Sequence, residues 1–269
     1  MPDVYAMINE VDEAVIERVA MAMDSSAADP QHREIVHRYL SDVELSGEER
    51  IVEIGCGTGA IGRLMAGAIT FAEYVGTDPS PALFVRARAH PDNVAAMRFE
   101  CADGGDQPFA DEEFDVAVLH RVLSHVPDQE SVVREAVRLL TPGGWLVVCD
   151  GDYSTTTLAL GRADPLECCV EAFLQSFVND AWVVRRLGRI AADAGITDAV
   201  QRSHGFVQVR DADYMLSIVA RGADELLAAG LVGPELAESL KAEAQRRIEH
   251  GTFFGHVAYG SLVGRKPRP

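Results

Sequence analysis

The sequence predicts an α/β protein with a doubly wound, mainly parallel, seven-stranded sheet. From residue 50 onward, short apolar segments alternate with amphipathic helical segments, which is typical of parallel strands joined by crossover helices. A glycine-rich turn follows the first of these strands and opens a helix, an arrangement typical of nucleotide-binding sheets. The expected strands cover residues 51–54, 74–77, 97–101, 114–119, 145–149, 200–209 and 253–263.

Helical segments precede the sheet and interrupt its second half. Residues 1–48 predict two helices, because apolar residues from Ile8 to Met23 recur at steps of three and four before residues 24–30 break the pattern. Ser80 suits a helix N-cap and Pro81 the first helical position. Further helices are expected at residues 61–69, 128–140, 165–178, 182–194, 214–229 and 234–250.

The composition excludes several classes of protein. The chain has 269 residues and a net charge of −18, so we expect no nucleic acid partner. Its apolar runs are shorter than the roughly 18 residues of a membrane span, and its five cysteines lack the spacing of a zinc site. Residues 1–10 lack the basic start of a signal peptide. We therefore expect a soluble, cytoplasmic protein without metal or membrane, whose oligomeric state stays open, a homodimer included.

The glycine turn at residues 52–59 is compatible with either of two kinds of ligand. Glycines allow sharp backbone turns and close ligand approach, and Asp78 ends the next strand, where a carboxylate can bind ribose hydroxyls. Residues 57–62 match the G-x-G-x-x-G pattern of nicotinamide dinucleotide sites. Glu53 weighs against that alternative, because an acid there would repel a pyrophosphate but tolerate a cationic ligand.

Five motifs in order resemble the class I S-adenosylmethionine (SAM)-dependent methyltransferases. They are the glycine turn, Asp78, and residues 101–103, 109–119 and 140–146. The chain is most similar to the small-molecule branch, which includes ubiquinone and menaquinone C-methyltransferases and natural-product enzymes. The resemblance implies a Rossmann-like fold and transfer of the SAM methyl group to carbon, oxygen or nitrogen of a small-molecule substrate by in-line displacement. A SAM-fold binding protein without turnover is the alternative.

This resemblance divides the chain into a helical lid segment, residues 1–48, and a SAM-binding domain, residues 49–269. Helical insertions are expected near residues 154–180 and 211–250. Histidine can act as a base near neutral pH, so His125, with Asp152 to orient it, is the catalytic candidate. Substrate-binding candidates are Tyr5, Tyr153, Phe254 and His256. The cofactor-binding candidates are Arg33, Glu53, Gly55, Gly57, Gly59, Asp78, Pro79, Ser80, Asp103, Gly104 and His120.

Overall fold

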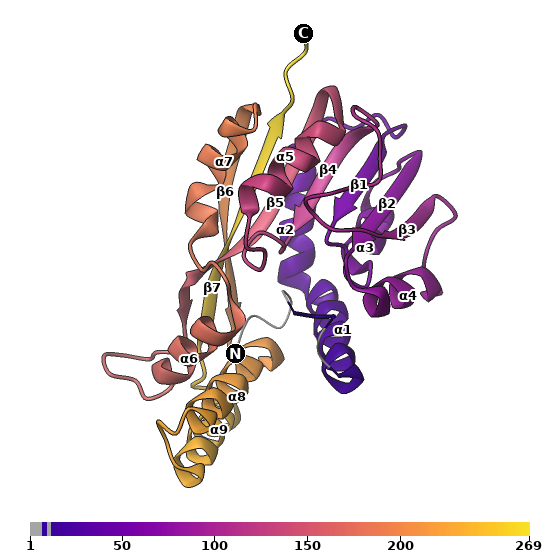
Figure 1. Ribbon diagram of the computed structural model, residues 1–269. Coiled ribbons are helices and arrows are strands. Elements are labelled where there is room, and N and C mark those ends of the chain that lie inside the picture. The colour runs from indigo at the N-terminus through magenta and orange to yellow at the C-terminus, as the bar shows by residue number, and fades with distance from the viewer. Residues whose placement is uncertain (1–6, 10–11) are drawn as a thin grey trace.

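The computed structural model describes residues 7–9 and 12–269, which contain one seven-stranded sheet in the order β3-β2-β1-β4-β5-β7-β6 (Figure 1). Strands β1 to β5 are parallel, and β7 runs antiparallel between β5 and β6. The predicted fold class is therefore confirmed. The strands are β1 Arg50–Ile54, β2 Glu73–Asp78, β3 Met97–Cys101, β4 Phe114–His120, β5 Leu140–Thr157, β6 Thr197–Gln208 and β7 Gly255–Arg265.

Helices cover both faces of the sheet. Ser80 caps α4 by accepting the N–H of Leu83, with Pro81 at the first helical position, as predicted. Asp29 caps α2 in the same way through the N–H of Gln31. The α-helices are α1 Glu13–Ala28, α2 Pro30–Leu40, α3 Ala60–Ala68, α4 Pro81–Ala89, α5 Gln129–Leu139, α6 Glu167–Phe177, α7 Leu187–Asp193, α8 Asp213–Ala228 and α9 Pro234–Glu249, and η1 Val183–Arg186 is a 3-10 helix.

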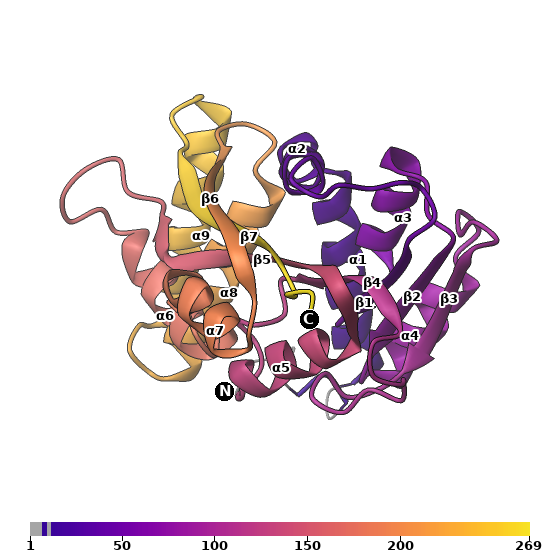
Figure 2. The same cartoon turned by 90° about the horizontal axis from the view of Figure 1, so that it is seen from above.

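Two apolar layers hold the sheet between its helices. On one face, Tyr39 of α2 and Met65 of α3 pack with strand residues such as Tyr74. On the other face, Val132 of α5 and Leu187 of α7 pack with residues from β1, β4 and β5. Figure 2, seen from above, shows α2 and α3 on one side of the strands and α5 and α7 on the other. The carboxyl ends of β1, β2 and β4 stay open for a site.

The insertion helices α6, α8 and α9 pack together at the far end of the long strands β5, β6 and β7 (Figure 1). Gly222 lets α8 approach α6 closely, because a Cβ there would lie 2.0 Å from the carbonyl oxygen of Cys169. These helices lie within the two expected insertions. Strand β5 is longer than predicted, since it begins at Leu140 and continues to Thr157.

The prediction that residues 24–30 separate the two N-terminal helices is wrong, because it ends the first helix too early. Helix α1 continues through Ala28, and Asp29 alone separates it from α2. The polar residues of this stretch misled the prediction because they have partners on other elements. Asp24 accepts hydrogen bonds from Thr58 and Arg63, and Ser26 bonds His32 and Arg121.

Candidate functional site

A cavity of about 400 Å³ lies at the carboxyl ends of β1, β2 and β4, and we call it the glycine-turn cavity. It combines backbone of the glycine turn with acidic residues from the ends of β2 and β3 and with the segment after β4. Met23 of α1 and residues 8–9 also border it. Its lining residues are Ile8, Asn9, Met23, Ile54, Gly55, Asp78, Pro79, Leu83, Asp103, Gly104, Gly105, Arg121, Val122, His125, Val126, Pro127, Asp128, Ser131 and Val132.

The glycine turn at this cavity requires glycine for two reasons. Gly55, Gly57 and Gly59 all have positive φ angles, 76°, 53° and 76°, which L side chains rarely adopt. A Cβ on Gly55 would also lie 2.5 Å from Cγ2 of Val122, on the cavity wall. The backbone therefore passes the cavity at a place where no side chain fits.

Asp78 ties the glycine turn to the end of β2. Its Oδ2 accepts the N–H of Gly57 at 2.9 Å, and its Oδ1 accepts the N–H of Ser80 at 2.9 Å. The side chain is 7% exposed, and burial raises its pKa, while the two backbone donors act in the opposite direction. Each carboxylate oxygen has a second lone pair for a ligand in the cavity.

Glu53 lies beneath the turn and not in the cavity lining. The hydroxyl of Tyr74 donates to Glu53 Oε2 at 2.5 Å, and the carboxyl group is 1% exposed. Burial raises the pKa of Glu53 to about 8, so the carboxyl group is protonated at neutral pH in this state. Its partner is a phenol on β2, which the sequence alone did not indicate.

The segment after β4 brings several polar residues together. His120 is buried against Tyr39, with 3.2 Å between its Nδ1 and the tyrosine hydroxyl, and burial lowers its pKa to about 3. Arg121 follows in the left-handed region with φ of 59°, and its N–H donates to the carbonyl oxygen of Cys149 at 2.7 Å. Arg121 and His125 line the cavity, whereas His120 lies behind it.

The structure brings Gly55, Asp78, Pro79, Asp103, Gly104 and His125 together in the lining of the glycine-turn cavity. Gly57, Gly59 and Ser80 are not among its lining residues, but Gly57 and Ser80 donate their backbone N–H groups to Asp78, which is one. Arg33 does not join them, since it is exposed and borders a separate surface depression with His37 and Arg63. Tyr5 lies outside the described residues.

The remaining candidates contact other groups. Arg185 donates from its Nε to Asp152 at 2.9 Å, and Ser154 donates to the same carboxylate. Tyr153 is buried, with its ring centroid 6.3 Å from that of His125. Phe254 and His256 stack on each other in parallel, with centroids 6.4 Å apart. None of these four is among the lining residues of the cavity.

The sequence did not single out several lining residues as site residues. Asn9 donates from its side chain to the carbonyl oxygen of Pro79 at 3.0 Å, which joins the N-terminal segment to β2's end. Met23 comes from α1 and Val132 from α5, and both are apolar positions of ordinary helical periodicity. Arg121 had one usable signal, its position directly after a strand that ends at the site.

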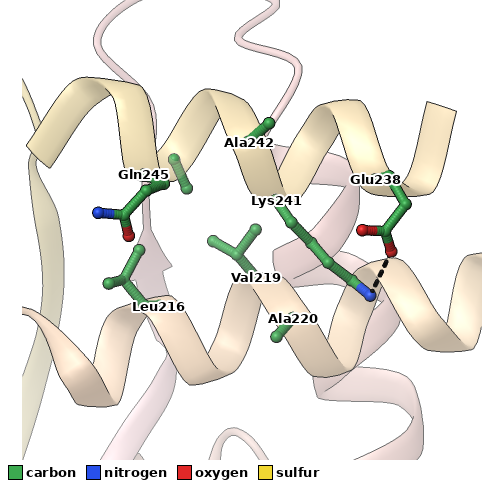
Figure 3. A pocket seen from close by; sticks show the side chains of 8 residues that line it. Leu216, Val219, Ala220, Glu238, Lys241, Ala242 and Gln245 are labelled. Atoms are coloured by element: carbon green, nitrogen blue, oxygen red, sulfur yellow. Dashed lines mark hydrogen bonds and ion pairs between the residues drawn. The ribbon is translucent and has the colours of Figure 1, made fainter. Parts of the chain in front are cut away.

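A different depression separates α8 from α9 (Figure 3). Leu216, Val219 and Ala220 of α8 face α9 there. Lys241 of α9 pairs with Asp224 of α8 at 2.6 Å and with Glu238 of its own helix at 2.9 Å. This depression contains no residue of the glycine turn or of the strand ends, so we assign no part of the site to it.

Three comparisons with known proteins agree with this fold. Residues 52–148 match the family described as Methyltransferase domain. An uncharacterized 37.1 kDa protein of transposon TN4556 from Streptomyces fradiae is 27% identical over 95% of this chain and 73% of its own length. Methyltransferase str2 from Strobilurus tenacellus is 31% identical over 53% of this chain and 50% of its own. The crystal structure of YcgJ from Bacillus subtilis superimposes with a TM-score of 0.58 at 17% identity, covering 87% of this chain and 98% of that one.

The fold and the glycine turn define a Rossmann-like methyltransferase domain. Residues 52–148 match a methyltransferase domain, and the chain is similar to SAM-dependent methyltransferases, whose cofactor is S-adenosylmethionine. It spans about half the length of curated methyltransferases that it matches. In the part of the chain that the structure describes, no helix has the length and apolar character needed to cross a membrane.

Proposed function

We propose that the glycine-turn cavity binds SAM and that the protein transfers its methyl group to a small-molecule acceptor by in-line displacement. The observation that carries this proposal is the joint position of Asp78 and Gly55 on one cavity wall. Asp78 would supply a carboxylate for ribose hydroxyls, and the absence of a Cβ on Gly55 lets Val122 pack against the turn at the cavity wall. The residues therefore fit the cofactor of the class.

Bound SAM supplies a methyl group that its positive sulfonium already activates. The protein's residues then need to orient the cofactor and acceptor and to keep water out, and positioning alone contributes on the order of 7–11 kcal/mol at best. Asp103 and Gly104 would contact the adenine end, as the family resemblance suggests. The hydrogen bond from Tyr74 to Glu53 would hold the end of β1 against β2, and the contact of Tyr39 with His120 would hold α2 against the end of β4.

Residues 1–48 would act as the lid of this cavity. Met23 and Asn9 from this segment border the cavity, and Asp24 latches α1 to the glycine turn through Thr58. Such a segment must move for a ligand to enter and return to exclude water. Residues 49–269 would form the SAM-binding domain with its two helical insertions.

His125 remains the candidate for a general base, because its side chain borders the cavity. Asp152 could orient His125 only after breaking its ion pair with Arg185, so the base role of His125 does not depend on Asp152. A base is required only where the acceptor atom carries a proton at neutral pH. Tyr153 packs behind His125 and would help to position it.

The nicotinamide alternative loses support from the family match, since residues 52–148 align with methyltransferases. The other alternative is a binding protein without turnover. An incubation distinguishes a methyltransferase from such a binding protein. It combines the protein with SAM that carries a labelled methyl group and with pooled phenols, carboxylic acids and amines. We expect the wild type to form a labelled product, and we expect less of it from His125→Gln or Asp78→Ala. Saturable SAM binding with no labelled product from any pool would favour the binding protein.

A further inference from the structure

A second cavity of about 320 Å³ lies where the N-terminal helices meet the end of β6 and the start of α8. Aromatic rings and small polar groups line it, so we call it the aromatic cavity. It shares no lining residue with the glycine-turn cavity. Its lining residues are Ala22, Ser25, Ser26, Ala28, Asp29, His32, Phe206, Gln208, Asp211, Asp213, Tyr214 and Ser217.

Arg121 lies at the boundary of the two cavities. It belongs to the lining of the glycine-turn cavity, and its Nη1 donates to Ser26 Oγ of the aromatic cavity at 2.7 Å. Its guanidinium also lies 5.9 Å from the ring centroid of Tyr214 and 6.0 Å from that of Tyr259. A cation is therefore held between the proposed cofactor and the aromatic cavity.

His32 presents a second donor at the same place. Ser26 Oγ accepts from Arg121, so its own proton is available for His32 Nδ1, 3.1 Å away. With Ser26 as the donor in this contact, the imidazole proton of His32 lies on Nε2. The Nε2 atom has no hydrogen-bond partner among the described residues. Solvent does not replace one, because His32 is only 2% exposed. A buried donor without a partner destabilises the protein, and a ligand oxygen that bonds it would remove this cost.

The ring of His32 is fixed and uncharged. It stacks on Phe206 with centroids 4.4 Å apart and meets Tyr259 edge to face at 4.9 Å. Burial, followed by the charge of Arg121, lowers the pKa of His32 to about 2. The aromatic cavity thus has one neutral N–H donor in its wall, and the cation of Arg121 lies at its boundary with the glycine-turn cavity.

The carboxylates of the aromatic cavity lie at more exposed positions. Asp211 and Asp213 are exposed, so solvent screens their charges. Asp29 is committed to the N–H of Gln31 at the start of α2, at 2.8 Å. The rim of the cavity is therefore acidic, and an anion is favoured only beside Arg121 and His32.

We propose that the aromatic cavity receives the methyl acceptor, and that this acceptor is a small ring compound with an anionic oxygen, which Arg121 and His32 bind. The proposal rests on the proposed function, because it places the acceptor next to bound SAM. Aromatic walls from Phe206 and Tyr214 suit a planar ring, and the two donors suit a carboxylate or phenolate.

Three fluorinated probes of similar size test the charge preference: 4-fluorobenzoate, 4-fluorobenzamide and 4-fluorobenzylamine. Their binding to protein saturated with S-adenosylhomocysteine is measured by fluorine NMR. We expect 4-fluorobenzoate to bind at least tenfold more tightly than the other two. His32→Phe keeps the stacking ring and removes the donor, and Arg121→Gln removes the cation, so each should abolish most of this preference. His37→Phe, on the exposed side of α2, is the matched control and should keep it.

The outcomes separate this inference from the proposed function. S-adenosylhomocysteine should bind His32→Phe as it binds the wild type, which also reports that the variant folds. Equal affinities of the three probes, preference for the amine, or no binding of 4-fluorobenzoate at millimolar concentration would each overturn the acceptor proposal. Failure of S-adenosylhomocysteine to bind the wild type would instead overturn the proposed function itself.

Discussion

The carboxylate of Asp78 accepts the backbone N–H of Gly57 at 2.9 Å, so the end of β2 holds the turn that follows β1. Asp78 ends β2, and Gly57 lies in the turn after β1, the neighbouring parallel strand, whose register pairs Ile54 with Thr77. A single side chain thereby shapes the turn and presents its remaining lone pairs to the cavity. Its loss would affect both the apo protein and the binding of the cofactor.

Asp78→Ala should lower the affinity for S-adenosylhomocysteine tenfold or more, because hydrogen bonds to a charged group contribute about 1.5–3 kcal/mol each. It should also lower the free energy of unfolding of the apo protein by about 1–3 kcal/mol, since two buried N–H groups lose their acceptor. Asp78→Asn keeps one acceptor oxygen and should fall between. Calorimetry and denaturant unfolding measure the two effects. An unchanged affinity in Asp78→Ala would contradict the ribose assignment.

Gly55→Ala should destabilise the protein by about 2–5 kcal/mol, because it combines a left-handed residue with a Cβ 2.5 Å from Val122. The double variant Gly55→Ala/Val122→Ala should recover part of this loss but not the cofactor affinity. Gly67→Ala in α3 is the matched control, since its Cβ meets nothing within 4 Å. Alanine in a helix should leave stability equal or up to about 1 kcal/mol higher. Equal stabilities of the Gly55 and Gly67 variants would refute this account of the turn.

Glu53→Gln should change how stability depends on pH. Burial raises the pKa of Glu53 to about 8, from a usual value of 4.5, so the native state holds a proton that the unfolded state releases between these values. This contribution is fully present below pH 4.5 and is lost as the pH rises toward 8. Glutamine does not titrate. The free energy of unfolding of the variant should therefore rise relative to that of the wild type by at most about 1.4 kcal/mol per pH unit in this window. A constant difference from pH 5 to pH 8 in urea unfolding of the apo proteins would show that Glu53 is ionised.

The latch between Asp24 and Thr58 should control opening of the lid. Asp24 Oδ1 accepts from Thr58 Oγ1 at 2.7 Å and from Arg63 at 3.2 Å. In hydrogen exchange, residues 13–28 should gain protection when S-adenosylhomocysteine binds, and Asp24→Ala should reduce their protection without ligand. Helix α9 borders neither cavity and is the internal reference.

Glu17→Ala is the control variant for this latch. It removes the half-exposed ion pair of α1 with Arg86, which should contribute little. Exchange in α1 that responds to neither ligand nor Asp24→Ala would mean that the N-terminal segment is a fixed wall.

Local signals were sufficient for the fold and for much of the glycine-turn cavity. These signals depend only on neighbours in the chain. They are the period change at residue 50, the helix start at Ser80 and Pro81, and the three glycines of the turn. The structure has an element start or a turn at each of them. Asp78 could be found because parallel strands end at one edge.

Contacts between distant segments could not be predicted in this way. Helix α1 runs past Asp24 because the polar residues there are paired with Thr58, Arg63 and Arg121. Asp152 pairs with Arg185, and His32 gains its buried donor only when α2 packs against Phe206 on β6. A single sequence gives no signal for such pairs, since their spacing along the chain follows no fixed period.

Titration calorimetry of the apo protein with SAM, S-adenosylhomocysteine and NAD tests the central claim most directly. We expect saturable binding of the first two with one site per chain, loss of that binding in Asp78→Ala, and no binding of NAD at the same concentrations. Micromolar binding of NAD with no response to SAM or S-adenosylhomocysteine would contradict the account and return the glycine turn to a nicotinamide dinucleotide site.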